Sequence, residues 1–247
     1  MRRYRAMALV ALAATALLSG VPAKAIETDI RSYVCSKLDD FVATMKVVKA
    51  DQRALNKIGK DFGMLYRFND VQMRYKEPNM VRVEGTVEGT KGVYIVSGTV
   101  QLVSIPKIGM KTRRDFGNSP GKRKSLMDVG LVSEYYLTYA TARFVREGTV
   151  EGTPVAVFDF TYKDRDEDTS HHMIYIDPKT KVVRRRDSYT QDGKLQAVYT
   201  FKNVTLVAPG IWFPTRVEVQ TTDRVLAGVS EYTDIKVNTG MSDSIFR

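Results

Sequence analysis

The sequence predicts a mainly β protein whose sheet is closed or half closed on itself and is covered by apolar helices. Two observations predict this fold class. From residue 71 onwards, short runs that alternate apolar and polar residues recur at roughly ten-residue spacing, with turn residues between them. Two other stretches, 30–45 and 126–140, carry apolar residues at helical spacing. Strands with one apolar face need a cover, and two apolar helices can supply it.

The clearest hairpin lies at Leu195–Val219. Both of its halves alternate apolar and polar residues with period two, and Pro209-Gly210 separates them as a turn. The apolar phase slips after Phe201, which predicts a β-bulge near Lys202–Asn203. One face of this hairpin is therefore apolar and requires a packing partner.

Other strands follow the same alternation. Val71, Met73 and Tyr75 alternate with polar residues in the first of them. The heptapeptide EGTVEGT occurs at both Glu84–Thr90 and Glu147–Thr153, but the flanking residues do not match. This repetition predicts one kind of hairpin used twice and not a duplicated domain. Further strands are expected at 80–83, 92–96, 99–105, 143–150, 155–162, 172–176, 182–190 and 225–237.

Two helices are expected to cover the sheet. Five apolar residues from Ile30 to Met45 are spaced by four, four, three and four positions, and Thr28 or Asp29 can cap such a helix. The single cysteine, Cys35, is expected as a buried thiol on this helix. The second helix, Leu126–Ala140, has an apolar face wide enough to require burial on more than one side.

The N-terminus has the pattern of a cleaved secretory signal peptide. Three arginines precede the apolar run Ala6–Leu18, and Ala23-Lys24-Ala25 follows it. The run is too short for a good membrane span. Cleavage after Ala25 leaves one expected domain, 26–247, in the periplasm, and removing the leader's four basic residues lowers the net charge from +10 to +6. Export argues against nucleic acid as a partner and favours anionic lipid or acidic protein.

A basic segment at 107–124 interrupts the strand pattern. It carries seven lysines and arginines and a single acid, together with several glycines and one proline. This composition predicts an exposed loop. A solvated loop is the simpler interpretation, and a contact for anionic head groups or a partner is the alternative.

Three motifs that resemble catalytic or metal sites fail on inspection. Residues 117–121 match G-x-S-x-G, but Pro120 follows Ser119 and has no backbone N–H for an oxyanion hole. The aspartates at 164, 166 and 168 have calcium-loop spacing but lack the loop glycine and the closing glutamate. His171 and His172 are adjacent on an expected strand and point to opposite faces. The sequence therefore predicts no catalytic residue, no metal site and no cofactor.

The order of elements resembles the LolA-like lipoprotein carriers of the outer-membrane lipoprotein-sorting family. The residues that carry the resemblance are Tyr75–Val83, with its K-x-P-N-like strand turn, His172–Val183, Tyr199-Thr200-Phe201 and Pro209–Pro214. The resemblance implies an unclosed, strongly curved half-barrel of ten or eleven strands, lidded by two or more helices around a cavity for acyl chains. It also implies a non-enzymatic carrier that moves lipoproteins or lipids toward the outer membrane, with membrane transport partners.

One departure from the family concerns the lid. The family's carriers have an arginine before the turn proline, which ties the lid shut, whereas Glu77 stands here. Glu77 and Arg82 are therefore the latch candidates. Three alternatives remain at this point: an envelope sensor of the RseB type that binds acyl chains to signal, a β-barrel enzyme on lipid substrates, and a domain with a filled core and no ligand.

The expected ligand cavity lies between the helix at 126–140 and the inner face of the sheet. Both contribute more apolar positions than one contact stripe needs. The residues expected to line it are Val71, Met73, Tyr75, Val132, Tyr136, Phe213 and Val217.

Overall fold

The computed structural model describes residues 26–247, so the expected signal peptide at 1–25 lies outside the described residues. One antiparallel sheet of 13 strands dominates the fold, in the order β6-β5-β4-β3-β2-β1-β13-β12-β11-β10-β9-β8-β7. The strands are β1 (Asp40–Ala50), β2 (Phe68–Lys76), β3 (Met80–Val87), β4 (Thr90–Ser97), β5 (Val100–Ile105), β6 (Met110–Asp115), β7 (Ala140–Val150), β8 (Thr153–Tyr162), β9 (His171–Ile176), β10 (Val183–Tyr189), β11 (Leu195–Ala208), β12 (Ile211–Thr221) and β13 (Leu226–Val237). The expected half-barrel is confirmed, with more strands than the ten or eleven expected.

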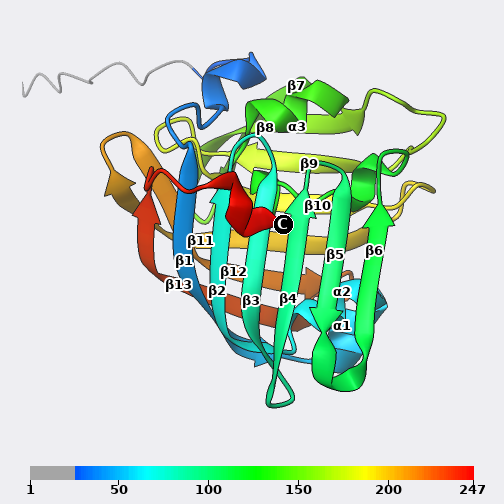
Figure 1. The fold of residues 1–247 in the computed structure, drawn as a ribbon. Helices are drawn as coiled ribbons and strands as arrows, with labels where there is room; N and C mark the ends of the chain where they lie inside the picture. The colour runs from blue at the N-terminus through cyan, green and yellow to red at the C-terminus, as the bar shows by residue number, and fades with distance from the viewer. Residues whose placement is uncertain (1–25) are drawn as a thin grey trace, which may run out of the picture.

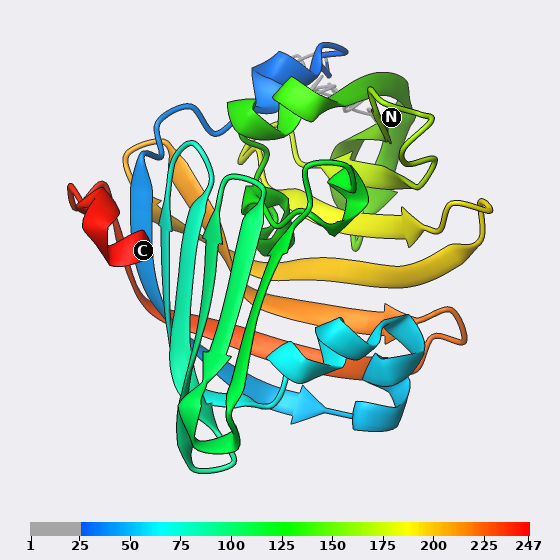
Figure 2. The same ribbon diagram turned by 45° about the vertical axis from the view of Figure 1, so that its right-hand side comes forward.

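The sheet curls so that its two halves cross. Strands β2–β6 run in front of β8–β12 in Figure 1, and β6 and β7 remain as unpaired edges of the described sheet. Figure 2 shows α1 and α2 at one end of the interior and α3 near the other. The helices are α1 (Gln52–Ile58), α2 (Lys60–Leu65) and α3 (Glu134–Tyr139), with 3₁₀ turns η1 (Ile30–Tyr33), η2 (Pro106–Ile108), η3 (Pro120–Lys122), η4 (Leu126–Val129) and η5 (Asp243–Phe246).

The helix expected at Ile30–Met45 is wrong. Only η1 is helical, and β1 begins at Asp40. Phe41 pairs with Tyr75 of β2 on one side and with Val237 of β13 on the other, so this backbone satisfies its hydrogen bonds in the centre of the sheet. Cys35 lies after η1 and not on a helix face; it is half-buried, and burial raises the pKa of its thiol to about 11.

The helix expected at Leu126–Ala140 is also interrupted. It consists of η4, a left-handed Gly130 with φ of 82°, and the short α3. Ser125 and Asp128 form a capping box at the start of η4, and Ser133 caps α3. Two separate caps and a glycine between them therefore replace one continuous helix with two short pieces.

The α1–α2 pair was not expected from the sequence. Asp51 caps α1 by accepting the backbone N–H groups of Arg53 and Ala54 at 3.0 Å. Buried Leu55 and Ile58 pack α1 against the main core. The pair closes the end of the half-barrel opposite α3 (Figure 2).

The hairpins behave largely as expected, with two corrections. Both EGTVEGT copies form tight hairpins whose Glu-Gly turns have positive φ at Glu88, Gly89, Glu151 and Gly152. The bulge expected near Lys202–Asn203 is wrong: the β11–β12 register shifts between Leu206 and Ala208. The basic segment at 107–124 is exposed, but it contains edge strand β6 and so is not a loop throughout.

Two apolar clusters stabilise the sheet. The larger one fills the interior, and a smaller one groups Phe68, Val71, Val87 and Ile105. The C-terminal η5 lies against β3 and β4 near the chain end marked in Figure 1, where it buries Phe246. Within residues 26–247 no helix is long and apolar enough to cross a membrane.

Candidate ligand cavity

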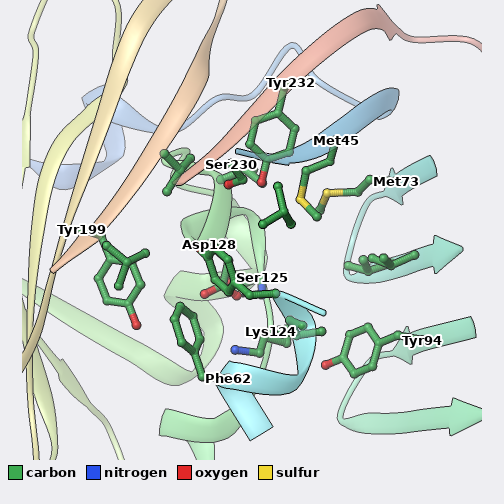
Figure 3. A pocket seen from close by; sticks show the side chains of 18 of the residues that line it. Met45, Phe62, Met73, Tyr94, Lys124, Ser125, Asp128, Tyr199, Ser230 and Tyr232 are labelled. Carbon is green, nitrogen blue, oxygen red and sulfur yellow. The ribbon is translucent and has the colours of Figure 1, made fainter. Parts of the chain in front are cut away.

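An apolar cavity of about 130 Å³ lies inside the half-barrel. One water needs only ~10–15 Å³ of such space. Figure 3 shows side chains from both halves of the sheet pointing toward this space. The lining residues are Met45, Val47, Phe62, Leu65, Tyr66, Met73, Val81, Val83, Tyr94, Lys124, Ser125, Asp128, Val129, Arg186, Tyr199, Val217, Val219, Ser230 and Tyr232.

Strand periodicity positions most of this lining. Residues two apart on a strand share a face, so Val81 and Val83 of β3 and Val217 and Val219 of β12 all reach the cavity. The α2 helix contributes Phe62 and Leu65 from one end. The walls are therefore mainly aliphatic and aromatic, which suits a hydrocarbon chain.

The remaining lining forms a polar end. Arg186 projects from β10 and is only 6% exposed. Its Nη1 donates to Oδ1 of Asp128 at 3.3 Å and to the carbonyl oxygen of Met127 at 3.4 Å. Burial tends to raise the pKa of Asp128, but the charges of Lys124 and Arg186 outweigh it and lower that pKa. Asp128 is therefore ionised at neutral pH and pairs with Arg186.

Tyr66, Tyr199 and Tyr232 line the cavity with uncharged side chains. Burial raises the pKa of Tyr199 and raises that of Tyr232 to about 12. The pKa of Tyr66 is raised even further, again chiefly by burial. Each hydroxyl is therefore protonated at physiological pH and is able to donate or accept a hydrogen bond.

A second cavity, of about 250 Å³, lies next to the first. It extends beneath β5 and β6 and includes Phe116. Four residues line both cavities, and they form the wall between them: Phe62, Leu65, Tyr94 and Lys124.

The structure places the expected cavity residues in three groups. Met73 and Val217 line the first cavity. Tyr75 and Phe213 flank Phe41 in the packed core, with ring centroids 5.6 and 5.2 Å from it. Val71 belongs to the smaller cluster, while Val132 and Tyr136 are buried in the main core; these five residues do not line the first cavity.

The two latch candidates, Glu77 and Arg82, contact different parts of the structure. Arg82 donates to the carbonyl oxygen of Ile245 at 2.9 Å and to Glu84 at 2.6 Å, so it fastens the C-terminal segment. Glu77 lies beside Tyr75, near the start of α3. Burial raises the pKa of Glu77 to about 7; Tyr75 opposes this rise, and the charges of Asp39 and Glu134 add to it.

The residues of the three rejected motifs, 117–121, 164–168 and 171–172, lie in loops, turns and a strand. Ser119 is the residue before η3, and its side chain makes no cap hydrogen bond there. Asp168 accepts the backbone N–H of Gly121 at 3.0 Å and that of Ser170 at 2.9 Å, so it fixes a loop. Nε2 of His172 lies 3.0 Å from the hydroxyl of Tyr162, whereas His171 stacks on Tyr189. No group of metal-ligating side chains occurs within the described residues.

Sequence reasoning missed the polar end and α2. The inward orientation of Arg186 was hidden because residues 184–187 are all charged, so their sequence shows no alternation of apolar and polar positions. The α2 contribution was detectable, because Leu55, Ile58, Phe62 and Leu65 are spaced by three, four and three after the capping Asp51.

Comparisons with known proteins identify the fold. A family model described only as "Uncharacterized protein" matches residues 121–247, more than half of the chain. No curated protein matches the chain.

Solved structures match over most of the chain. A putative outer membrane lipoprotein-sorting protein domain from Vibrio parahaemolyticus is 14% identical with a TM-score of 0.57, covering 88% of this chain and 93% of that one. A DUF1329 family protein from Desulfovibrio piger is 13% identical with a TM-score of 0.56, covering 88% and 92%. The LolA superfamily protein NE2245 from Nitrosomonas europaea is 15% identical with a TM-score of 0.54, covering 85% and 90%. The fold is therefore LolA-like.

Proposed function

We propose that this chain, which belongs to the family of uncharacterised proteins whose model matches residues 121–247 and has a LolA-like fold, is a carrier of acyl chains. The observation that supports this proposal most directly is the apolar cavity between the two halves of the sheet and α2. Its cargo is a lipid or the acyl part of a lipoprotein. Its place of action is the periplasm, after cleavage of the expected signal peptide, and its direction of transport is toward the outer membrane.

The physical chemistry of the lining suits reversible binding. Each buried CH₂ group contributes roughly 0.8 kcal/mol, before the costs of ordering the ligand and the side chains that meet it. The aliphatic and aromatic walls require no covalent bond to hold such a chain. A carrier must also release its cargo, and affinity built from many weak contacts allows release when a competing apolar environment becomes available.

The test is direct binding. The protein purified gently from the periplasm should carry lipid in native mass spectrometry. Added palmitate should raise the thermal midpoint, because a ligand at 100 times its Kd stabilises the folded state by about 2.7 kcal/mol. Absence of bound lipid together with no thermal shift would refute the proposal.

A matched pair of variants on β2 locates the binding site. Met73→Glu puts a carboxylate into the cavity and should abolish the palmitate-induced thermal shift, because an unpaired charge is poorly tolerated beside hydrocarbon. Gln72→Glu places the same group on the opposite face of the strand and should leave the shift intact. Equal shifts in the two variants would place the ligand outside this cavity.

A further inference from the structure

Arg186 faces the concave side of the sheet, among apolar and aromatic neighbours. It is directly opposite Tyr199 of β11 in the strand register, and its Cζ lies 4.0 Å from the centroid of the Tyr199 ring. The residues before and after it, Arg185 and Asp187, point the other way and form an ion pair at 2.6 Å. Among the described side chains, Arg186 is the one arginine in the lining of the first cavity.

The protein satisfies this guanidinium only in part. Its two hydrogen bonds from Nη1, to Asp128 and Met127, measure 3.3 and 3.4 Å, longer than the usual ~2.9–3.0 Å for N–H···O. The buried Nε atom has no hydrogen-bond partner among the described residues. A buried donor left without a partner costs ~1–3 kcal/mol, so the protein's own contacts do not saturate this guanidinium.

The charge at the polar end is also unbalanced. Among the side chains that the structure describes, Asp128 is the one acid in the lining of the first cavity, whereas Lys124 and Arg186 both line it (Figure 3 shows Lys124, Ser125 and Asp128 together). Asp128 is shared, because its Oδ2 atom accepts the backbone N–H of Ser125 at 3.1 Å. Lys124 makes no ion pair with an acid within the part of the chain that the structure describes. Two cations facing one carboxylate leave one positive charge for a ligand.

We infer that Arg186 and Lys124 bind the anionic head, a carboxylate or a phosphate, of the amphiphile whose chain fills the cavity. This inference rests on the proposed function, and it narrows the cargo from any acyl chain to amphiphiles with an anionic head. The chain lies against the valines of β3 and β12, and the head receives a guanidinium N–H of Arg186 and the ammonium of Lys124. Charge-assisted hydrogen bonds of this kind are shorter and stronger than those between neutral groups.

The test compares three probes with the same sixteen-carbon chain and different heads: palmitate, hexadecyl phosphate and hexadecanol. Competition against a fluorescent fatty acid gives the affinity of each. The wild type should bind the two anionic probes about ten- to hundredfold more tightly than hexadecanol, the range that one hydrogen bond to a charged group supplies. Inorganic phosphate alone should not compete, and competition by it would show that the polar end takes free phosphate and not a lipid head.

Three variants test whether Arg186 and Lys124 cause the preference for anionic heads. Arg186→Gln and Lys124→Gln should each lower the ratio of palmitate to hexadecanol affinity at least about fivefold while retaining hexadecanol binding. Lys124 is half-exposed with no ion pair, so its variant folds even if Arg186→Gln does not. Arg185→Gln, on the opposite face of β10, is the control and should keep the wild-type ratio.

The outcomes separate this inference from the function on which it rests. Equal affinity of the wild type for palmitate and hexadecanol, or an unchanged ratio in Lys124→Gln and Arg186→Gln, overturns head recognition and leaves the carrier proposal standing. Failure of all three probes to bind overturns both. Loss of affinity for all probes by the same factor in Arg186→Gln identifies a purely structural arginine and also overturns head recognition.

Discussion

Gly130 lies directly against the ring of Phe201. A Cβ atom added to Gly130 would stand 2.6 Å from Cδ1 of that ring, and the backbone of Gly130 is left-handed with φ of 82°. This close approach brings the segment between η4 and α3 down onto β11. It also explains why the apolar stretch at 126–140 does not form one helix, since a left-handed residue ends a helix and a side chain there would clash.

Gly130→Ala should therefore lower the free energy of unfolding by about 3 kcal/mol. The left-handed conformation costs a non-glycine residue ~1–2 kcal/mol, and displacing a packed ring adds to it. Gly89→Ala is the matched control: its φ is 73°, but nothing lies within 4 Å of the added Cβ, so only the conformational cost of about 1 kcal/mol applies. Chemical denaturation of both variants measures the difference, and equal losses would contradict the packing explanation.

Glu77 should give stability an unusual pH dependence. Its folded-state pKa of about 7 lies above the ordinary value of 4.5, so the folded protein holds the proton more tightly than the unfolded chain. The stabilisation is complete below pH 4.5 and is lost as pH rises through 7. Because the carboxyl is partly exposed, the loss amounts to about 1 kcal/mol.

Glu77→Gln removes this titration. The variant should match the wild type at pH 4.5 and exceed it at pH 8, when unfolding is followed by denaturant titration at both values. Glu134→Gln is an instructive comparison, because it removes one of the charges that raise the Glu77 pKa and should weaken the pH dependence without abolishing it. Identical pH profiles for Glu77→Gln and the wild type would show that Glu77 does not titrate in this range.

Ser119→Ala should leave palmitate binding and stability unchanged. Ser119 precedes Pro120 at the start of η3, and Pro120 cannot donate an oxyanion-hole N–H. Surface substitutions of this kind usually alter stability by less than about 0.5 kcal/mol. A folded Ser119→Ala protein that has lost its activity would identify a nucleophile that this fold does not otherwise indicate.

The strands could be predicted from sequence because their period of two is distinctive, whereas the helices could not be placed reliably. Residues four apart share a face in a strand as well as in a helix, so the pair Phe41 and Met45 fits both. This segment forms strand β1 and not a helix because it pairs with both β2 and β13. No local signal reports such long-range pairing.

The candidate site was less predictable than the fold. The lining of a cavity and a packed core use the same apolar residue types, so the sequence could not distinguish Met73 from Tyr75. Both face the same side of β2, but Met73 borders the cavity, whereas the ring of Tyr75 packs against that of Phe41. The decisive difference is where η4 and α2 stop covering the sheet, and that depends on contacts with distant strands. The inward orientation of Arg186 likewise becomes visible only once its register with Tyr199 is fixed.

Phe62 should set the length of chain that the first cavity accepts. It lines both cavities and belongs to the wall between them, and its ring packs 5.8 Å from that of Tyr199 and 5.4 Å from that of Tyr66. Phe62→Ala removes this ring and opens a passage into the neighbouring cavity of about 250 Å³. Because Phe62 is only half-buried, we expect a stability loss of about 2 kcal/mol, below the range for fully buried phenylalanines.

A series of saturated fatty acids of increasing length measures this effect. In the wild type, affinity should rise with each CH₂ until the chain fills the first cavity and then level off. In Phe62→Ala the rise should continue for several more carbons, each adding roughly 0.8 kcal/mol before ordering costs. Phe116→Ala is the control, because Phe116 lines only the second cavity and leaves the wall in place. A chain-length limit that stays where it is in Phe62→Ala, or that moves equally in both variants, would show that this ring does not separate the two spaces for a bound chain.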